Sequence, residues 1–209
     1  FEPIGLVGYS PTLLVANAAG PVKDVKDMVA QLKAKPDKFN YASAGNGTAP
    51  HFAAELFKLS AGVGMVGVPY KGSAPAVSDT IGGQTQFMFP SLFTALPHVK
   101  GGKLKALAVA GPKRSALLPN VPTMKEAGVD GVEVQQWYGF FAPAKTPKAI
   151  LDAQSALLAG IVRDSEVTPK FHAQGYTTTA SNAEQMRVRI NEDIAALEKL
   201  VKAGKLTKQ

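Results

Sequence analysis

Three short turns hold the groups of this chain that are best suited to binding a ligand. Each turn is rich in Gly, Ser or Thr, follows a strand-like run and leads directly into a helix-like run. A helix N-terminus has free backbone N–H groups and a partial positive charge, so a turn of this kind can hold an anion. In an open α/β sheet, ligands bind where the carboxyl ends of strands meet helix starts. The pattern therefore predicts a site for a small carboxylate or phosphate.

The candidate ligand-binding residues come from these turns and from one later segment. They are Ser43, Ala44, Gly45, Gly47 and Thr48 in the first turn, Tyr70, Lys71 and Gly72 in the second, Pro90 and Ser91 in the third, and Trp137 in the later segment. The glycines let a ligand approach the backbone closely. Thr48, Ser73 and either Pro90 or Ser91 are expected to cap the helices that follow. Each turn alone is also typical of an ordinary strand-to-helix connection. Lys71 alone could be an ordinary surface lysine, and Trp137 a tryptophan of the core or of a hinge. Their succession favours a site.

Motifs for catalysis and for metal binding are weak. The three histidines lie far apart, cysteine is absent, and neither an HExxH motif nor an acidic cluster at ligand spacing occurs. Ser43 lacks the first Gly of the GxSxG elbow, and the GNGTAP run fits neither a dinucleotide fingerprint nor a P-loop. We therefore expect no enzymatic activity, no cofactor and no metal. The alternative is an enzyme that acts on a phosphorylated or acyl substrate at the same turns, with Ser43, His51 or Lys71 as the catalyst.

Composition indicates a folded domain with a real core. Of the 209 residues, 45% are hydrophobic and 19% are charged, which argues against wholesale disorder. The net charge of +7 comes from Lys and Arg spread along the chain. Because no basic motif interleaved with aromatic residues accompanies this charge, we expect no nucleic-acid partner. No apolar stretch approaches the length of a membrane span.

The elements that must position the turns alternate between strands and helices. A strand at Leu13–Ala16 leads to a helix at Val22–Lys35, whose apolar residues fall at helical spacing. A helix follows the first turn at 49–60, a second begins at Ser73 and stops at Gly82-Gly83, and Leu104–Ala110 is an apolar run of strand length. This alternation predicts an α/β fold with a parallel sheet that is covered on both faces.

The C-terminal third reads mostly as helix. Val132–Ala144 is strand-like, Thr146-Pro147 opens a helix to about Val162, and Ser181 with Glu184 makes a capping box before a long helix. These helices need a surface to pack on, and little sheet is left over for them. We predict a complete α/β lobe over residues 10–133, with 1–9 and 134–209 as hinge crossings and an incomplete partner lobe.

Several separate motifs carry a family resemblance. NYASAGNGTAPHFAAELFK, VPYKGSAPAVSD, ALPHVKGGKLKALAVAGPKRS, LPNVPTMKEAG and WYGFFAPAKTPK stand in one order and spacing. Together they resemble the Bug-type periplasmic solute-binding receptors of tripartite tricarboxylate transporters, and the similarity runs from about Phe1 to the C-terminus. The resemblance implies a two-lobed, periplasmic-binding-protein-like Venus flytrap. Such a receptor captures a small organic acid in the periplasm, hands it to a membrane permease and performs no chemistry. It also implies that Ser43 to Thr48 hold one end of the ligand, beside Pro69 to Gly72 and Pro90-Ser91.

Two departures from the family pattern qualify these expectations. Members of the family usually begin well before the position of Phe1, with a strand and a Pro/Gly-rich loop that grips the ligand's other carboxylate. We therefore expect that the N-terminal part is lacking and that any signal peptide lies outside this chain. Many relatives carry Asp where this chain has Pro90. Loss of that carboxylate favours a dicarboxylate or aromatic carboxylate over an amino acid.

The incomplete partner lobe leads to an expectation about assembly. Helices over 147–163 and 182–203 should expose apolar faces, so the chain is expected to self-associate. A third interpretation of the fold is an effector-binding regulatory domain of similar lobed shape. That interpretation needs an attached DNA-binding segment upstream, and the sequence shows none.

Overall fold

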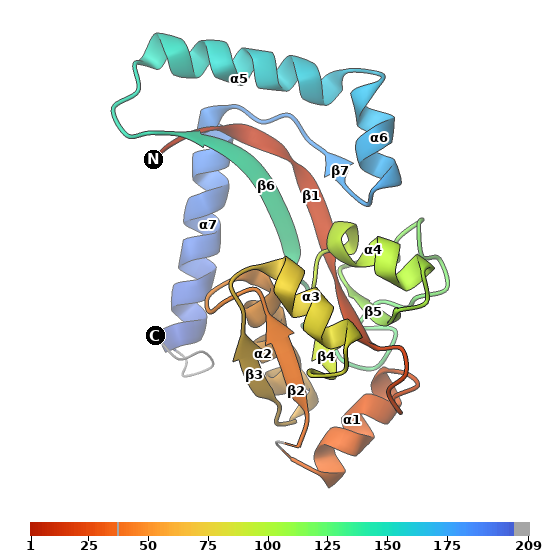
Figure 1. The fold of residues 1–209 in the computed structure, drawn as a ribbon. Helices are drawn as coiled ribbons and strands as arrows, with labels where there is room; N and C mark the ends of the chain where they lie inside the picture. Colours follow the sequence, from red (N-terminus) through yellow and green to blue (C-terminus); the bar gives the residue numbers. More distant parts are fainter. Residues whose placement is uncertain (37, 203–209) are drawn as a thin grey trace. The chain divides into compact units, whose positions relative to one another are not determined.

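The computed structural model describes residues 1–36 and 38–202. Within them the chain forms two compact units (Figure 1). Unit 1 consists of Phe1–Ser10 and the chain from Trp137 onwards, and unit 2 is Pro11–Gln136. The chain therefore passes between the units twice, at residues 10–11 and at residues 136–137. That the stretch 10–133 is a complete lobe stays a prediction.

Strands and helices alternate through unit 2, and helices dominate the later part of unit 1. The elements in chain order are β1 (Glu2–Asn17), α1 (Val25–Ala34), β2 (Asn40–Ser43), α2 (Ala49–Ala61), β3 (Val66–Pro69), α3 (Ser73–Ile81), β4 (Phe87–Met88), α4 (Leu92–Lys100), β5 (Leu104–Ala110), β6 (Gln135–Ala142), α5 (Lys148–Arg163), α6 (Val167–Ala173), β7 (Thr177–Thr178) and α7 (Ala183–Lys202). Residue 203, the last of the predicted C-terminal helix, lies outside the described residues. The predicted α/β class is confirmed.

The sheet of unit 2 is mixed, with the strand order β3-β2-β4-β1-β5. β2 runs parallel to β3 and β4, whereas β1 runs antiparallel to β4 and β5. The prediction of a wholly parallel sheet is therefore wrong at β1. A helix between two strands predicts that those strands are parallel, but it does not reveal that another strand lies between them. Here β1 separates β4 from β5.

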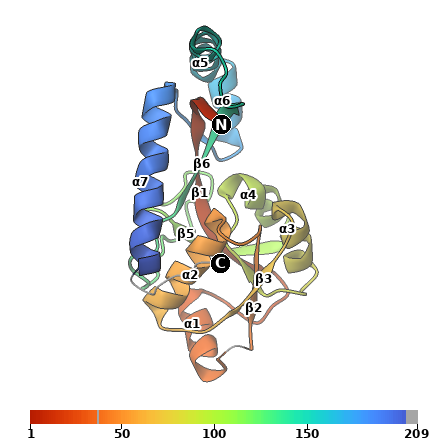
Figure 2. The same cartoon turned by 90° about the vertical axis from the view of Figure 1, so that its left-hand side faces the viewer.

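Both faces of this sheet are buried, as predicted. One core cluster joins β1 to α1 and α2 through residues such as Leu14, Met28 and Phe57. The other joins β1 to α3 and α4 through residues such as Val15 and Leu96. Consecutive side chains of a strand point to opposite faces, so neighbours in β1 serve different clusters. Figure 2 shows α1 and α2 on one side of the sheet and α3 and α4 on the other.

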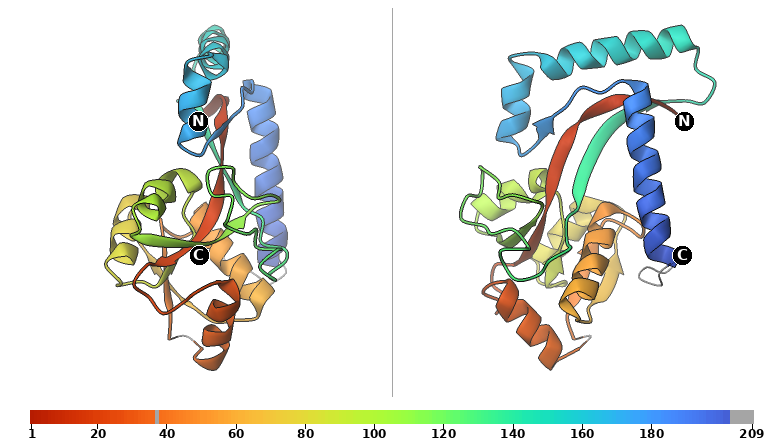
Figure 3. Two further views of the ribbon diagram at one scale, coloured as in Figure 1. Left: turned by 90° about the vertical axis from the view of Figure 1, so that its right-hand side faces the viewer. Right: turned by 180° about the vertical axis from the view of Figure 1, so that it is seen from behind.

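In unit 1, α7 lies against the N-terminal half of β1 and against β6 (Figure 3). The helix starts one residue later than predicted. Asn182 Oδ1 accepts a hydrogen bond from the N–H of Gln185, and Gln185 Oε1 accepts one from the N–H of Asn182. The predicted capping box of Ser181 and Glu184 is therefore wrong. Ser181 instead binds β1, because its buried Oγ accepts a hydrogen bond from the Leu6 N–H at 2.8 Å.

Helix α5 exposes an apolar stripe. Ile150, Leu157 and Ile161 are all about half exposed or more, and they fall on one side of the helix. Val188 and Ile194 on α7 are exposed to a similar degree. The predicted exposure of apolar side chains on both helices is confirmed, while the self-association expected from it stays a prediction. Within the described part of the chain, no helix combines the length and apolar character needed to span a membrane.

Candidate ligand-binding site

Strand register brings the three turns to one edge of unit 2. β2 is paired in parallel with β3 and with β4, so the C-terminal ends of all three strands lie at the same edge of the sheet. The first two turns touch directly. The Tyr70 N–H donates to the Ser43 carbonyl at 3.0 Å, and the Gly72 N–H donates to the Ala44 carbonyl at 3.2 Å. The third turn follows β4, whose Met88 pairs with Ala42 of β2. This edge is where α/β sheets hold ligands.

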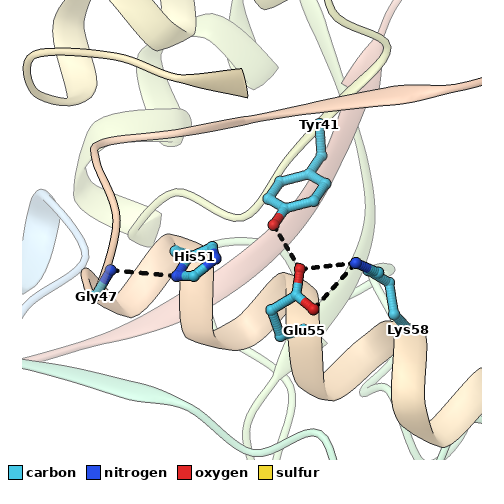
Figure 4. Close-up of polar contacts among 5 residues, drawn as sticks. All are labelled: Tyr41, Gly47, His51, Glu55 and Lys58. Atoms are coloured by element: carbon cyan, nitrogen blue, oxygen red, sulfur yellow. Dashed lines mark hydrogen bonds and ion pairs between the residues drawn. The ribbon is translucent and has the colours of Figure 1, made fainter. Parts of the chain in front are cut away.

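The first turn is folded back onto α2. Gly45 and Gly47 both have positive φ angles, +123° and +75°, which favour glycine. Thr48 is the N-cap residue of α2, but its side chain makes no cap hydrogen bond. Its Oγ1 instead donates to the Gly45 carbonyl at 2.6 Å. His51 Nδ1 accepts the Gly47 N–H at 3.2 Å, as Figure 4 shows. The prediction that Thr48 is the N-cap residue of α2 is confirmed, but its hydroxyl closes the turn instead of accepting a hydrogen bond from the helix.

This folding leaves a set of donors free on the turn. The backbone N–H groups of Ala44, Gly45 and Asn46 donate to no acceptor in the described part of the chain. The Ser43 hydroxyl also has no hydrogen-bond partner among the described residues, although Ser43 is only 1% exposed. Every fully buried side-chain oxygen or nitrogen in the described ranges does have a partner. The Ser43 hydroxyl must therefore be the part of this residue that reaches the surface.

The second turn carries a charged side chain, Lys71, and a hydroxyl, that of Tyr70, which already donates a hydrogen bond within the protein. Tyr70 Oη donates to Asp79 Oδ2 at 2.8 Å, so this proton is already used. Burial of the ring, the hydrogen bond and the Asp79 charge raise the pKa of Tyr70. Lys71 is exposed, and no described carboxylate lies within ion-pair distance of it. Gly72, with φ +106°, is the N-cap residue of α3. The prediction that Ser73 caps this helix is wrong, since Ser73 is the first helical residue.

The third turn is committed to the fold. Ser91 Oγ accepts the Thr94 N–H at 3.2 Å and shares a hydrogen bond with Thr94 Oγ1, so it caps α4 as predicted. The Pro90 carbonyl accepts the Leu13 N–H at 2.9 Å. Both Pro90 and Ser91 are buried. They shape this edge of the sheet with groups that are already paired.

A polar cluster fixes α2 to the strand that precedes it. The Tyr41 hydroxyl donates to Glu55 Oε1 at 2.7 Å, and Lys58 Nζ contacts both Glu55 oxygens at 2.9 and 3.0 Å (Figure 4). Burial and the adjacent Glu55 hold the pKa of Tyr41 above its usual range. A Cβ on Gly67 of β3 would lie 2.8 Å from the Tyr41 hydroxyl. Glycine at this position lets Tyr41 reach α2, and the N-terminus of α2 is thereby held at the end of β2.

Trp137 belongs to unit 1, whereas all the turn residues belong to unit 2. Its indole N–H donates to Asp193 Oδ2 at 2.7 Å. The polar end of the side chain is therefore engaged by α7. Sequence reasoning missed Asp193, because the two residues are 56 positions apart and no local pattern links them. Asn46 was not singled out as a site residue, but it lies within the predicted ligand-binding stretch Ser43 to Thr48.

The geometry gives no catalytic pairing to Ser43, His51 and Lys71. His51 Nδ1 is occupied by the Gly47 N–H, and no hydrogen bond joins any two of these three side chains in the ranges described. A nucleophile and its base lie within hydrogen-bond reach in most active sites of that type. Among the described residues no cluster of three or more His, Asp or Glu side chains could hold a metal ion.

Comparison with known proteins places the chain in a family. Residues 1–206 match the model for "Tripartite tricarboxylate transporter family receptor". Protein BugT of Bordetella pertussis is 32% identical over 192 residues, which cover 92% of this chain and 59% of BugT. A structure of an R. palustris protein with adipate superposes with a TM-score of 0.93 at 31% identity, covering 97% of this chain and 68% of that one. The structure of MatC from Rhodopseudomonas palustris with bound malate superposes with a TM-score of 0.90 at 29% identity, covering 96% of this chain and 69% of that one.

These matches extend along nearly the whole chain but not along the whole of its relatives. The chain spans about 60% of the length of the curated relatives that it matches first. The family match itself covers almost every residue of the chain. The chain belongs to the tripartite tricarboxylate transporter receptor family, and its fold is that of periplasmic binding proteins such as BugD, with a TM-score of 0.94.

Proposed function

We propose that this chain is a solute-binding receptor that holds one carboxylate of a small organic acid on the first turn of unit 2. The observation that carries the proposal is the set of free donors on that turn. The hydroxyl of Ser43 and the N–H groups of Ala44, Gly45 and Asn46 have no acceptor among the described residues. A carboxylate has about four lone-pair sites and accepts several such bonds at once.

Electrostatics favour an anion at this place without a metal ion. The turn leads directly into α2, a helix of 13 residues, whose N-terminus carries a partial positive charge. Lys71 in the adjoining turn is exposed and has no described ion-pair partner. Hydrogen bonds to a charged group contribute roughly 1.5–3 kcal/mol each. Before the cost of association is subtracted, two or three such bonds contribute roughly 3–9 kcal/mol, which is the range of millimolar to micromolar binding.

The chemistry of the turns favours acids that carry no amino group. Pro90 is apolar, and Asp79, the acidic residue beside the second turn, already accepts the Tyr70 hydroxyl. The three turns themselves contain no acidic side chain that could pair with an ammonium group. Two structural relatives were solved with adipate and with malate, both dicarboxylates without an amino group. We infer that the ligand is a dicarboxylate or an aromatic carboxylate.

The family relationship supports a place in transport. Family models and structural relatives describe transporter receptors and periplasmic binding proteins. We infer that the protein works in the periplasm, delivers its ligand to a membrane permease and performs no reaction on it. The lack of a hydrogen-bonded nucleophile and base at the turns, as far as the structure describes them, supports this inference.

Isothermal titration calorimetry with a matched set of ligands tests the proposal. Adipate, malate and benzoate are titrated alongside adipamide, which has the length of adipate but no charge, and 2-aminoadipate, which adds an amino group to adipate. We expect at least one of the three unaminated acids to bind, adipamide not to bind, and 2-aminoadipate to bind more weakly than adipate. Equal affinity for adipate and adipamide, or no heat with any carboxylate, would overturn the proposal.

A further inference from the structure

Two strands carry the chain between its units. The first crossing, at Ser10–Pro11, lies inside β1, and the second, at Gln136–Trp137, lies inside β6. These two strands are paired with each other. Tyr9 therefore stands just before the first crossing, and Trp137 is the first residue after the second one.

One helix of unit 1 contacts both of these residues, Trp137 through Asp193 and Tyr9 through Arg189. Asp193 Oδ2 accepts the Trp137 indole N–H at 2.7 Å, and Asp193 Oδ1 accepts the Arg189 Nε–H at 3.0 Å. The Arg189 guanidinium lies over the Tyr9 ring, 5.7 Å from its centroid. Each Asp193 oxygen thus has one donor, and each crossing strand contributes one aromatic residue. We call these four residues the α7 cluster.

The helix that carries this cluster is firmly seated on the same strands. Met186 on α7 is fully buried, and a Cβ on Gly139 of β6 would lie 2.6 Å from its terminal carbon. Just before the helix, Ser181 Oγ accepts the Leu6 N–H of β1. α7 is therefore fixed to both strands at its N-terminal end, and the α7 cluster extends this attachment along the helix towards the crossings.

Another ion pair of unit 1 provides a comparison for the Arg189–Asp193 pair of the α7 cluster. Lys148 and Asp152 on α5 form a pair with the same i,i+4 spacing as Arg189 and Asp193. Its side chains are 85% and 62% exposed, whereas those of Arg189 and Asp193 are 29% and 38% exposed. Exposed pairs of this kind contribute little to stability. The Arg189–Asp193 pair is less exposed, and it also contacts the Trp137 indole and the Tyr9 ring.

We propose that Asp193 is a positioning residue that ties the two crossing strands together through Trp137 and, by way of Arg189, Tyr9, and thereby sets the hinge on which carboxylate affinity depends. The effect on affinity rests on the proposed function. The tie between the strands does not, and it is measured without any ligand.

Hydrogen–deuterium exchange of the ligand-free chain tests the tie. Asp193→Ala removes the acceptor for both donors, Asp193→Asn keeps one oxygen for the Trp137 N–H but loses the charge, and Asp152→Ala removes a carboxylate of the same spacing elsewhere in unit 1. We expect exchange at Gly8–Ser10 and at Trp137–Tyr138 to rise about tenfold or more in Asp193→Ala, less in Asp193→Asn, and not in Asp152→Ala. Equal exchange in Asp193→Ala and Asp152→Ala would overturn the proposal.

Trp137 supplies a second readout, because it is the single tryptophan of the chain. Its emission spectrum should shift in Asp193→Ala and stay unchanged in Asp152→Ala. If Asp193→Ala fails to fold, Trp137→Phe, which keeps an aromatic ring but removes the N–H donor, takes its place in the exchange experiment. Unchanged exchange at Gly8–Ser10 in a folded Trp137→Phe variant would contradict the tie.

The ligand arm uses adipate and malate as probes. Release of the tie leaves more ordering to be completed on binding, so Asp193→Ala should bind the same acid about threefold or more weakly than Asp152→Ala. If the unaltered chain binds neither these acids nor an aromatic carboxylate, the proposed function fails while the exchange data still decide the tie. Faster exchange with unchanged affinity would refute the role of Asp193 in binding.

Discussion

The Ser43→Ala variant tests whether the Ser43 hydroxyl bonds to the ligand or contributes to the stability of the fold. In the structure the Ser43 hydroxyl bonds to no described residue, although the residue itself is almost fully buried. Removing a hydroxyl that has no protein partner costs the folded state little. Removing a hydrogen bond to a carboxylate costs roughly 1.5–3 kcal/mol, which is about a ten- to hundredfold loss of affinity. Ser43→Ala should therefore weaken carboxylate binding at nearly constant stability.

Ser91→Ala is the matched control, because it removes the same group from the neighbouring turn. The Ser91 hydroxyl is engaged as the cap of α4 through the Thr94 N–H. Loss of a cap costs about 0.5–2 kcal/mol of stability. For a chain of this size each kcal/mol lowers the melting temperature by roughly 2–4 °C. Ser91→Ala should therefore melt several degrees lower and retain most of its affinity.

Thermal melts followed by circular dichroism, together with calorimetric titration of adipate or malate, measure both quantities for both variants. The reasoning requires opposite patterns: affinity falls in Ser43→Ala, and stability falls in Ser91→Ala. A Ser43→Ala variant that binds as well as the unaltered chain would refute the assignment of this hydroxyl to the ligand. A Ser43→Ala variant that melts as low as Ser91→Ala would show that the hydroxyl serves the fold.

Four further outcomes are expected. Gly45→Ala should lose about 1–3 kcal/mol in urea unfolding, because φ is +123° at this position. Tyr41→Phe should lose about 0.5–1.5 kcal/mol in the same assay, because the bond to Glu55 disappears. Burial and the neighbouring Tyr138 raise the pKa of Tyr176 from 10.0 to about 12, so folding favours the neutral ring. That stabilisation is complete below pH 10 and is lost as the pH rises through about 12, which an alkaline unfolding curve measures. Light scattering should show concentration-dependent self-association through the apolar stripe of α5, and a monodisperse monomer would contradict it.

Local patterns revealed those parts of the fold that depend on neighbours in sequence. The apolar residues of α1 fall at helical spacing, and the structure buries that face through Val25, Met28 and Leu32. The glycines at the end of α3 also end the helix as predicted. Capping was predicted less well. A cap depends on the exact residue at which the helix starts, so a shift of one position replaced Ser181 by Asn182.

Long-range pairing could not be derived from the sequence. β1 runs from Glu2 to Asn17 across Ser10-Pro11, which reads as an interruption, because both units supply partners for it. No residue pattern within β1, β4 or β5 indicates that β1 lies between the other two strands. The donors of the first turn were predictable from Gly45 and Gly47, since a glycine-rich turn before a helix exposes N–H groups. The partner of the Thr48 hydroxyl was not predictable, because a Thr at an N-cap usually accepts a bond from the helix, whereas here it donates to the Gly45 carbonyl.

Backbone NMR tests the central claim most directly. Addition of adipate or malate to the ¹⁵N-labelled chain should move the amide resonances of Ala44, Gly45 and Asn46 more than any others, with Ser43 next, and adipamide should leave them in place. Those three N–H groups have no acceptor in the described part of the chain, so an incoming carboxylate changes their surroundings most. Shifts that leave these amides unchanged while others move, or no shifts at millimolar acid, would contradict a carboxylate site on this turn.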